Sequence, residues 1–225
     1  MKKLLMAVLA LSVSCSIAFA EGKTAKEIRK ERQEIRKMSK KELNTKVDKS
    51  IRKEAKRLAK EGWKVKPGAM PLEKQLERSY LMQCEFDETL FPKYIMGEAS
   101  SIGENYDAAH ISAQSLAITN MTSQLQTEIT ALTENMVANK QLSPEEATSL
   151  SETVMSSKSL ISQSIGRTIP VIECYRTNEK GNTEVLVRVA YNSELALEAA
   201  KKAIRAELER KGLNLHDQLD RVLGK

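Results

Sequence analysis

The sequence predicts a fold of the α+β class, in which a small antiparallel sheet packs on long helices behind an N-terminal basic helical arm. Three observations lead to this prediction. The chain is 29% charged, only 4% aromatic and poor in glycine and proline, a composition that suits a helix-rich protein. Residues 111–136 carry the strongest helical period, and two β-branched runs, 169–177 and 183–191, flank a glycine-containing loop. Because helices and strands do not alternate as βαβ units, the α+β class is favoured.

Residues 1–20 have the features of a secretory signal peptide. A pair of lysines, an apolar run over 4–13 and Ala18-Phe19-Ala20 follow one another. The run is shorter than the roughly 20 apolar residues that span a bilayer. We therefore expect cleavage between Ala20 and Glu21 and an exported protein, either periplasmic or associated with the outer membrane. Export argues against nucleic acid as a partner.

Cys15 offers a second interpretation of the same segment, because a lipoprotein signal places its acylated cysteine at the end of the apolar run. Ser14 has the small side chain expected directly before such a cysteine, but Ser12 fits the position three before it poorly. The pattern favours ordinary cleavage. Acylation of Cys15 is kept as an alternative, and it would anchor the protein to a membrane by acyl chains.

Residues 21–61 are predicted to form the basic helical arm, and residues 62–225 the α+β body. Thr24 and Glu27 have capping-box spacing at the start of the arm. From Lys23 onward the arm has 16 lysines and arginines against 7 acidic residues, whereas the body has 18 basic and 22 acidic residues. The positive charge is therefore concentrated in the arm.

The basic arm is the feature that most suggests a binding function. Lysine and arginine can hold an anionic envelope surface or acidic envelope proteins, and salt weakens each such contact. The candidate contacts are ten cations: Arg29, Lys30, Arg36, Lys37, Lys40, Lys41, Arg52, Lys53, Lys56 and Arg57. Two other interpretations stay open. The arm can be a solvated helix rich in ion pairs whose later turns dock on the body, or it can form a homo-oligomer through the apolar stripe Leu43, Val47, Ile51 and Leu58.

Helices dominate the predicted body. Residues 71–83 form a helix whose inner side carries Leu72, Leu76, Tyr80 and Gln83. The next helix has a core-facing stripe that consists of Ile111, Ile118, Met121, Leu125, Ile129, Leu132 and Met136. Its neighbours Ala109, Ala113 and Ala117 are small enough to let another helix or a sheet approach closely. Ser143-Pro144-Glu145-Glu146 has the pattern of a capping box with proline at the first helical position, and the helix that it opens buries Ala147, Leu150, Val154, Ile161 and Ile165.

The predicted strands are short. Trp63–Lys66 alternates as a very short strand, and residues 94–99 form a second one, weakened by Gly97. Residues 169–177 and 183–191 form a hairpin, with Val185, Val187, Val189 and Tyr191 on one face. A helix capped by Asn192-Ser193 follows through Arg210, and Gly212 ends it.

Two cysteines remain after removal of the signal peptide. Export permits a disulfide between Cys84 and Cys174, but the surrounding spacing shows no disulfide framework, and buried free thiols are favoured. These cysteines, His110 and His216 are scattered singly, whereas a metal site needs a cluster of ligands. We expect no metal and no cofactor.

The body also resembles a known family. The residues that carry the resemblance are Gly97-Glu98-Ala99-Ser100, the alanines Ala108, Ala109, Ala113 and Ala117, Leu125-Gln126-Thr127-Glu128-Ile129, and Val185-Leu186-Val187-Arg188-Val189-Ala190-Tyr191. Over residues 92–210 this pattern looks like the twenty-kilodalton envelope lipoprotein family (Lpp-twenty type) and related exported proteins of Gram-negative bacteria. The resemblance implies an α+β fold with a small sheet on helices, and an envelope location. It implies no agreed activity and no catalytic residues, and the sequence departs from the family in the poor lipobox before Cys15.

These observations favour a non-enzymatic binding or scaffolding protein of the cell envelope. The competing class is a hydrolase whose site forms only in three dimensions. His110, beside Asp107, and His216, beside Asp217, are the available histidines, and no motif places a serine or cysteine near them. A cleft with two close carboxylates, or a hydroxyl beside either histidine, would favour the hydrolase.

Overall fold

The computed structural model of this chain describes residues 30, 33–34, 37, 48–87 and 91–224. The chain divides into two compact units, Met1–Met38 and Ser39–Lys225. In the first unit the described residues have helical backbone and exposed side chains. All the elements named below belong to the second unit.

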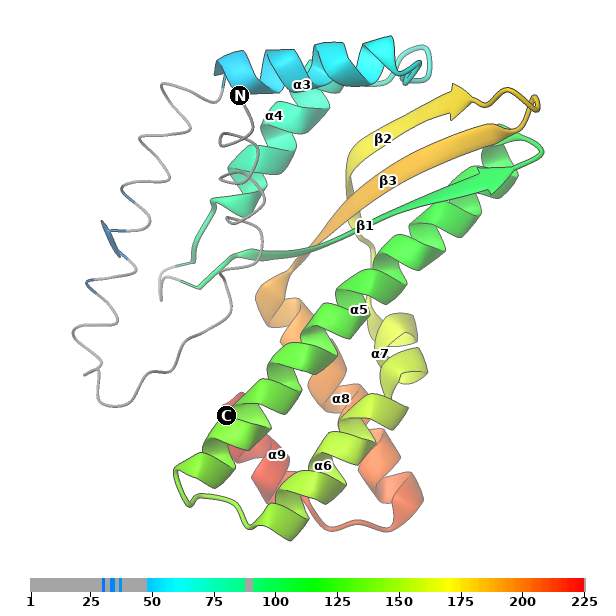
Figure 1. Ribbon diagram of the computed structural model, residues 1–225. Coiled ribbons are helices and arrows are strands. Elements are labelled where there is room, and N and C mark those ends of the chain that lie inside the picture. The colour runs from blue at the N-terminus through cyan, green and yellow to red at the C-terminus, as the bar shows by residue number, and fades with distance from the viewer. Residues whose placement is uncertain (1–29, 31–32, 35–36, 38–47, 88–90, 225) are drawn as a thin grey trace. The chain divides into compact units, whose positions relative to one another are not determined.

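The α+β prediction is confirmed. In the described part of the second unit there are seven helices and one three-stranded antiparallel sheet (Figure 1). In chain order the elements are α3 (Asp48–Lys60), α4 (Leu72–Gln83), β1 (Tyr94–Gly103), α5 (Tyr106–Ala138), α6 (Pro144–Ser156), α7 (Lys158–Ser164), β2 (Ile169–Thr177), β3 (Thr183–Asn192), α8 (Ser193–Lys211) and α9 (His216–Leu223).

The sheet has the order β1-β3-β2, so the C-terminal strand of the hairpin lies in the centre. β1 pairs antiparallel with β3 along its full length, from Tyr94 opposite Asn192 to Gly103 opposite Thr183. The predicted hairpin of β2 and β3 is confirmed, and its register shifts near Pro170, as expected for a proline in an edge strand. The first predicted strand is reduced to a single bridge, in which Lys64 pairs with Tyr175 of β2.

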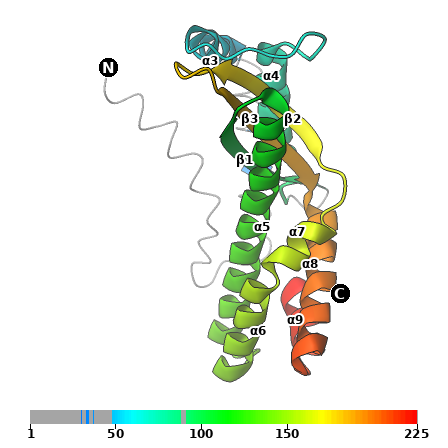
Figure 2. The same ribbon diagram turned by 90° about the vertical axis from the view of Figure 1, so that its right-hand side faces the viewer.

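Different helices cover the two faces of the sheet (Figure 2). The alternating valines of β3, Val185, Val187 and Val189, form a buried cluster with three alanines of α5. On the other face, α3 and α4 form a second cluster with β2 and with Ala190 of β3. Because successive strand residues point to opposite faces, one strand supports both clusters.

The small residues predicted to permit close approach do so where α5 crosses β1. A Cβ atom placed on Gly97 would lie 1.9 Å from the carbonyl oxygen of Ala117. Ala117 is itself fully buried against the sheet. The glycine and the alanine therefore bring the backbones of strand and helix into direct contact.

The far half of α5 packs with α6, α7, α8 and α9 around a third apolar cluster that includes Ile129, Leu150 and Ile204. The capping box at Ser143 is confirmed, because its side chain accepts from the Glu146 N–H at 3.2 Å while the Glu146 carboxylate accepts from the Ser143 N–H at 3.0 Å. The prediction of one helix up to Ile165 was wrong. The buried Ser157 separates α6 from α7 and donates its hydroxyl to the Thr153 carbonyl at 2.7 Å, the back-bonding that commonly bends helices.

One predicted inward residue in each of two helices was placed wrongly. In α4, Leu72, Leu76 and Tyr80 pack toward the core as predicted, but the last inward position is Met82 and Gln83 is exposed. In α5, Ile111 is 67% exposed, although the predicted stripe places it in the core. The buried face of the first half of α5 consists of alanines instead.

Two carboxylates, one in α8 and one in α9, should make the stability of the Ser39–Lys225 unit depend on pH in the acid range. Hydrogen bonding to Arg210 lowers the pKa of Glu207, and hydrogen bonding to Lys201 lowers that of Asp220. A lowered folded-state pKa adds stability above the unfolded-state pKa, and that stability is lost as the pH falls through the folded-state value. We expect the free energy of unfolding in urea to fall between about pH 5 and about pH 3. Glu207→Gln should flatten this dependence, and an unchanged slope in that variant would contradict the assignment to Glu207.

Candidate functional site

The basic part of the chain that the structure describes in detail is α3. Its buried residues, Ile51, Ala55 and Leu58, have helical spacing and pack in the cluster shared with α4 and the sheet. The predicted docking of the arm's later turns on the body is therefore observed. The boundary predicted at residue 61 differs from the structure, in which α3 is part of the core of the Ser39–Lys225 unit.

The opposite side of α3 carries six exposed cations, which we name the α3 basic face: Lys49, Arg52, Lys53, Lys56, Arg57 and Lys60. At 3.6 residues per turn they fall within an arc of about 140°. Glu54 and Glu61 fall outside that arc. The sequence thus builds a helix with one apolar side and one side of a single charge sign.

Within the described residues, one of these six cations has a carboxylate partner. Arg57 donates to Glu61 at 2.8 Å, an exposed pair of the kind that contributes little to stability. Glu54 accepts from the Tyr80 hydroxyl at 2.5 Å, which ties α3 to α4. Among the described residues, no carboxylate lies within ion-pair distance of the other five cations of the α3 basic face.

The segment after α3 fixes the helix on the sheet. Backbone hydrogen bonds of 2.7 and 2.8 Å join Lys64 to Tyr175 in both directions. The Trp63 ring is 8% exposed, and the Arg176 guanidinium lies 4.6 Å from its centre. Burial of Trp63 and the cation–π contact with Arg176 hold the C-terminal end of α3 in place.

The other predicted site residues are placed as follows. Lys30 and Lys37 are exposed residues of helical backbone in the Met1–Met38 unit. The predicted cleavage position at Ala20 and Glu21 and the alternative lipidation site Cys15 lie outside the described residues, as do Arg29, Arg36, Lys40 and Lys41, and Leu43 and Val47 of the predicted oligomer stripe. Arg52, Lys53, Lys56 and Arg57 are brought together on one side of α3.

No disulfide joins Cys84 and Cys174 in the structure. Cys174 is a free thiol, 1% exposed, in the core cluster between the sheet and α3–α4. Burial raises the pKa of the Cys174 thiol to about 12, so it stays protonated and unreactive. This agrees with the favoured interpretation for Cys174, whereas Cys84 is half-buried rather than buried.

One polar cluster was missed by the sequence analysis. Tyr106, in the first turn of α5, donates its hydroxyl to Glu173 of β2, and His110 Nε2 lies 3.4 Å from the other oxygen of the same carboxylate. The Tyr106 and His110 rings are stacked, with centres 5.6 Å apart, and Lys66 Nζ lies 3.5 Å from the centre of the Tyr106 ring. The residues come from three distant segments, so no local motif could have revealed the cluster.

This cluster does place a hydroxyl near a histidine, the arrangement that would favour a hydrolase. Burial and the hydrogen bond to Glu173 raise the pKa of Tyr106 well above its usual range. The phenol is therefore held as a protonated donor rather than as a nucleophile. In the structure the cluster ties the start of α5 to the edge strand β2.

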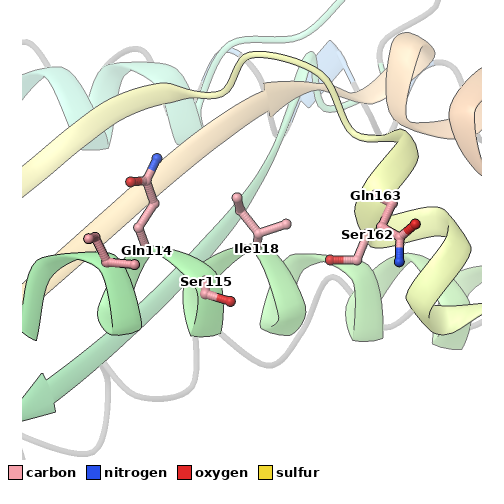
Figure 3. Close-up of a pocket in the computed structure, with 6 residues that line it drawn as sticks. Gln114, Ser115, Ile118, Ser162 and Gln163 are labelled. Carbon is pink, nitrogen blue, oxygen red and sulfur yellow. The ribbon is translucent and has the colours of Figure 1, made fainter. Parts of the chain in front are cut away.

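A shallow groove of about 330 Å³ lies elsewhere, between α5 and α7 (Figure 3). Ile111, Gln114, Ser115 and Ile118 of α5 and Ser162 and Gln163 of α7 line it. Its lining carries amides, hydroxyls and apolar groups but no ionisable side chain. The groove is thus separate from both the Tyr106 cluster and the α3 basic face.

Comparison of the chain with protein-family models, with curated proteins and with solved structures found no match. In the described ranges no helix is long and apolar enough to cross a bilayer. Over those same ranges, no group of three or more histidine, cysteine, aspartate or glutamate side chains is placed to hold a metal ion.

Proposed function

We propose that this protein is an exported, non-enzymatic binding or scaffolding protein of the cell envelope, and that the α3 basic face is its contact with an anionic partner. The observation that carries the proposal is that the two sides of α3 have different surroundings. Ile51, Ala55 and Leu58 are used in the core, and the cations on the opposite side point away from it. Long cationic side chains that have no carboxylate partner among the described residues are suited to contact a partner.

The exposed cations on one side of α3 support a binding function more strongly than the Tyr106 cluster supports hydrolysis. Hydrolysis needs an activated nucleophile next to a base. The Tyr106 hydroxyl is instead committed to Glu173, and its raised pKa disfavours the phenolate. The same Glu173 carboxylate also faces His110, so the three groups satisfy one another.

Attachment through a lipid on Cys15 is the alternative form of the same proposal. The resemblance to the envelope lipoprotein family favours it, and the poor fit of Ser12 disfavours it. The mass of the mature N-terminus separates the two forms. A chain that begins at Glu21 supports ordinary cleavage, and an acylated chain that begins at Cys15 supports the anchor.

The experiment is in-cell crosslinking followed by fractionation of the envelope. Deleting residues 23–61 would remove Ile51 and Leu58 from the core, so the matched comparison is the triple variant Arg52→Gln, Lys53→Gln, Lys56→Gln, which keeps the apolar side of α3. We expect the wild-type protein in the envelope fraction and a smaller share of the triple variant there. Equal attachment of both proteins would overturn the proposed role of the α3 basic face.

A further inference from the structure

We infer that the α3 basic face binds the headgroup surface of an anionic phospholipid membrane by electrostatics alone, without insertion of the helix. The inference rests on the proposed function, because it names the partner of the same face. It is narrower than that proposal, since it fixes both the chemistry of the partner and the depth of binding.

The apolar side of α3 is not available to a membrane. Amphipathic helices that insert bury their apolar side about 5–10 Å into the headgroup boundary. Here Ile51, Ala55 and Leu58 are each less than a tenth exposed and pack with Leu76 and Met82 of α4. Insertion would require α3 to leave the core and expose the α4 side of that cluster. The docked helix therefore presents only charge.

The shape of the α3 basic face fits an extended surface better than a small ligand. A helix of 13 residues is about 20 Å long, and its cations follow its full length. The groove described above lies between α5 and α7, whereas the α3 basic face is the convex side of a helix. A leaflet with many anionic headgroups can meet several such cations at once. A single phosphate or carboxylate compound could meet only one or two of them.

The absence of an aromatic anchor on this side points the same way. Trp63 is the single tryptophan of the chain, and membrane-interface proteins commonly use this residue as an anchor. In this protein its ring is buried below α3 and covered by Arg176. Binding should therefore be peripheral and reversible by salt, because the Debye length falls to about 3 Å in 1 M salt.

The test is co-sedimentation of the mature protein with vesicles. One set contains equal parts of phosphatidylglycerol and phosphatidylethanolamine, and the other contains phosphatidylcholine only. Each cation near an anionic surface strengthens binding by about fivefold, so Arg52→Gln, Lys53→Gln, Lys56→Gln should weaken binding to the anionic vesicles by about a hundredfold. The control is Arg167→Gln, Lys180→Gln, Lys202→Gln, which removes the same charge from exposed positions outside α3 and should weaken binding far less. Circular dichroism of each variant verifies that it is folded.

Trp63 fluorescence tests the depth of binding. Because the ring stays in the core, we expect its emission to be unchanged on vesicle binding and unquenched by brominated acyl chains. Quenching by those chains would overturn the claim of binding without insertion. Equal losses in the two triple variants, binding to phosphatidylcholine, or binding that persists at about 1 M salt would overturn the electrostatic claim.

The vesicle and envelope experiments fail separately. The triple variant of α3 can lose envelope attachment in cells while the wild-type protein does not bind anionic vesicles. In that case the membrane inference is wrong, and the proposed function holds with a protein as the partner. If the α3 variant keeps its envelope attachment, the proposed role of this face is wrong, whatever the vesicles show.

Discussion

Ile129→Ala should lower the free energy of unfolding by about 4 kcal/mol, whereas Ile111→Ala should change it by no more than about 0.5 kcal/mol. Both substitutions remove the same atoms from the same helix, α5. Ile129 is fully buried in the cluster of α5, α6, α7, α8 and α9, so its truncation loses burial and leaves a cavity. Ile111 is 67% exposed and has little contact to lose. Urea denaturation of the two variants measures the difference directly.

Two outcomes of the comparison between Ile129→Ala and Ile111→Ala would contradict the structure. Similar losses for the two variants would mean that α5 is rotated from its position in this structure, with Ile111 facing the core. A loss of less than about 1 kcal/mol for Ile129→Ala would mean that the helices around Ile129 do not pack as a core. The exposed Ile111 serves as the internal control for the change in helix propensity, because both sites exchange isoleucine for alanine within one helix.

The sequence could predict the existence of α5 but not the direction of its buried face. Its buried residues recur every four positions from Ala109 through Met121 to Ile129. A spacing of four in a helix of 3.6 residues per turn turns the buried face by about 40° at each step. The face turns because the first half of α5 packs on the sheet and the second half packs on helices. A stripe drawn on one fixed side therefore places Ile111 wrongly, although it places Ile129 correctly.

Local signals explain the other successes. Four consecutive residues are enough to predict the capping box at Ser143. Two β-branched runs around a loop are enough to predict the hairpin of β2 and β3. Each of these structures depends on near neighbours, so the sequence is sufficient. The break at Ser157 depends on a hydroxyl–carbonyl hydrogen bond in a buried position, which the apolar period does not record.

The site shows the same division between local and distant signals. Charge and period in one segment predict that Arg52 and Lys56 lie on a helix, and the structure places both on its exposed side. The contacts that hold α3, between Glu54 and Tyr80 and between Trp63 and Arg176, join residues far apart in sequence. No spacing rule brings such residues together. The sequence therefore could not show whether the apolar side of α3 is buried against the body or free to contact a membrane. The structure was needed to show that it is buried.

Gly97→Ala should destabilise the Ser39–Lys225 unit by about 3 kcal/mol, and by more if the two backbones cannot separate. The added Cβ would lie 1.9 Å from the Ala117 carbonyl oxygen and 2.9 Å from the Met121 Cβ. β1 is paired with β3 along its full length, and α5 is fixed at both ends by separate clusters. Relief therefore requires strand and helix to move apart, which loosens the core between them. Urea denaturation measures the loss.

Two further variants show whether backbone contact is the cause. At Gly166 an added Cβ would meet only the Tyr191 hydroxyl, at 3.3 Å, so Gly166→Ala should cost less than about 1 kcal/mol. Adding Ala117→Gly to Gly97→Ala should restore nothing, because the obstructing atom is a carbonyl oxygen and glycine further weakens the helix. Rescue by Ala117→Gly would show instead that side-chain volume sets the distance between β1 and α5. The absence of rescue, together with a tolerant Gly166, would assign the loss to the close approach of the two backbones at Gly97.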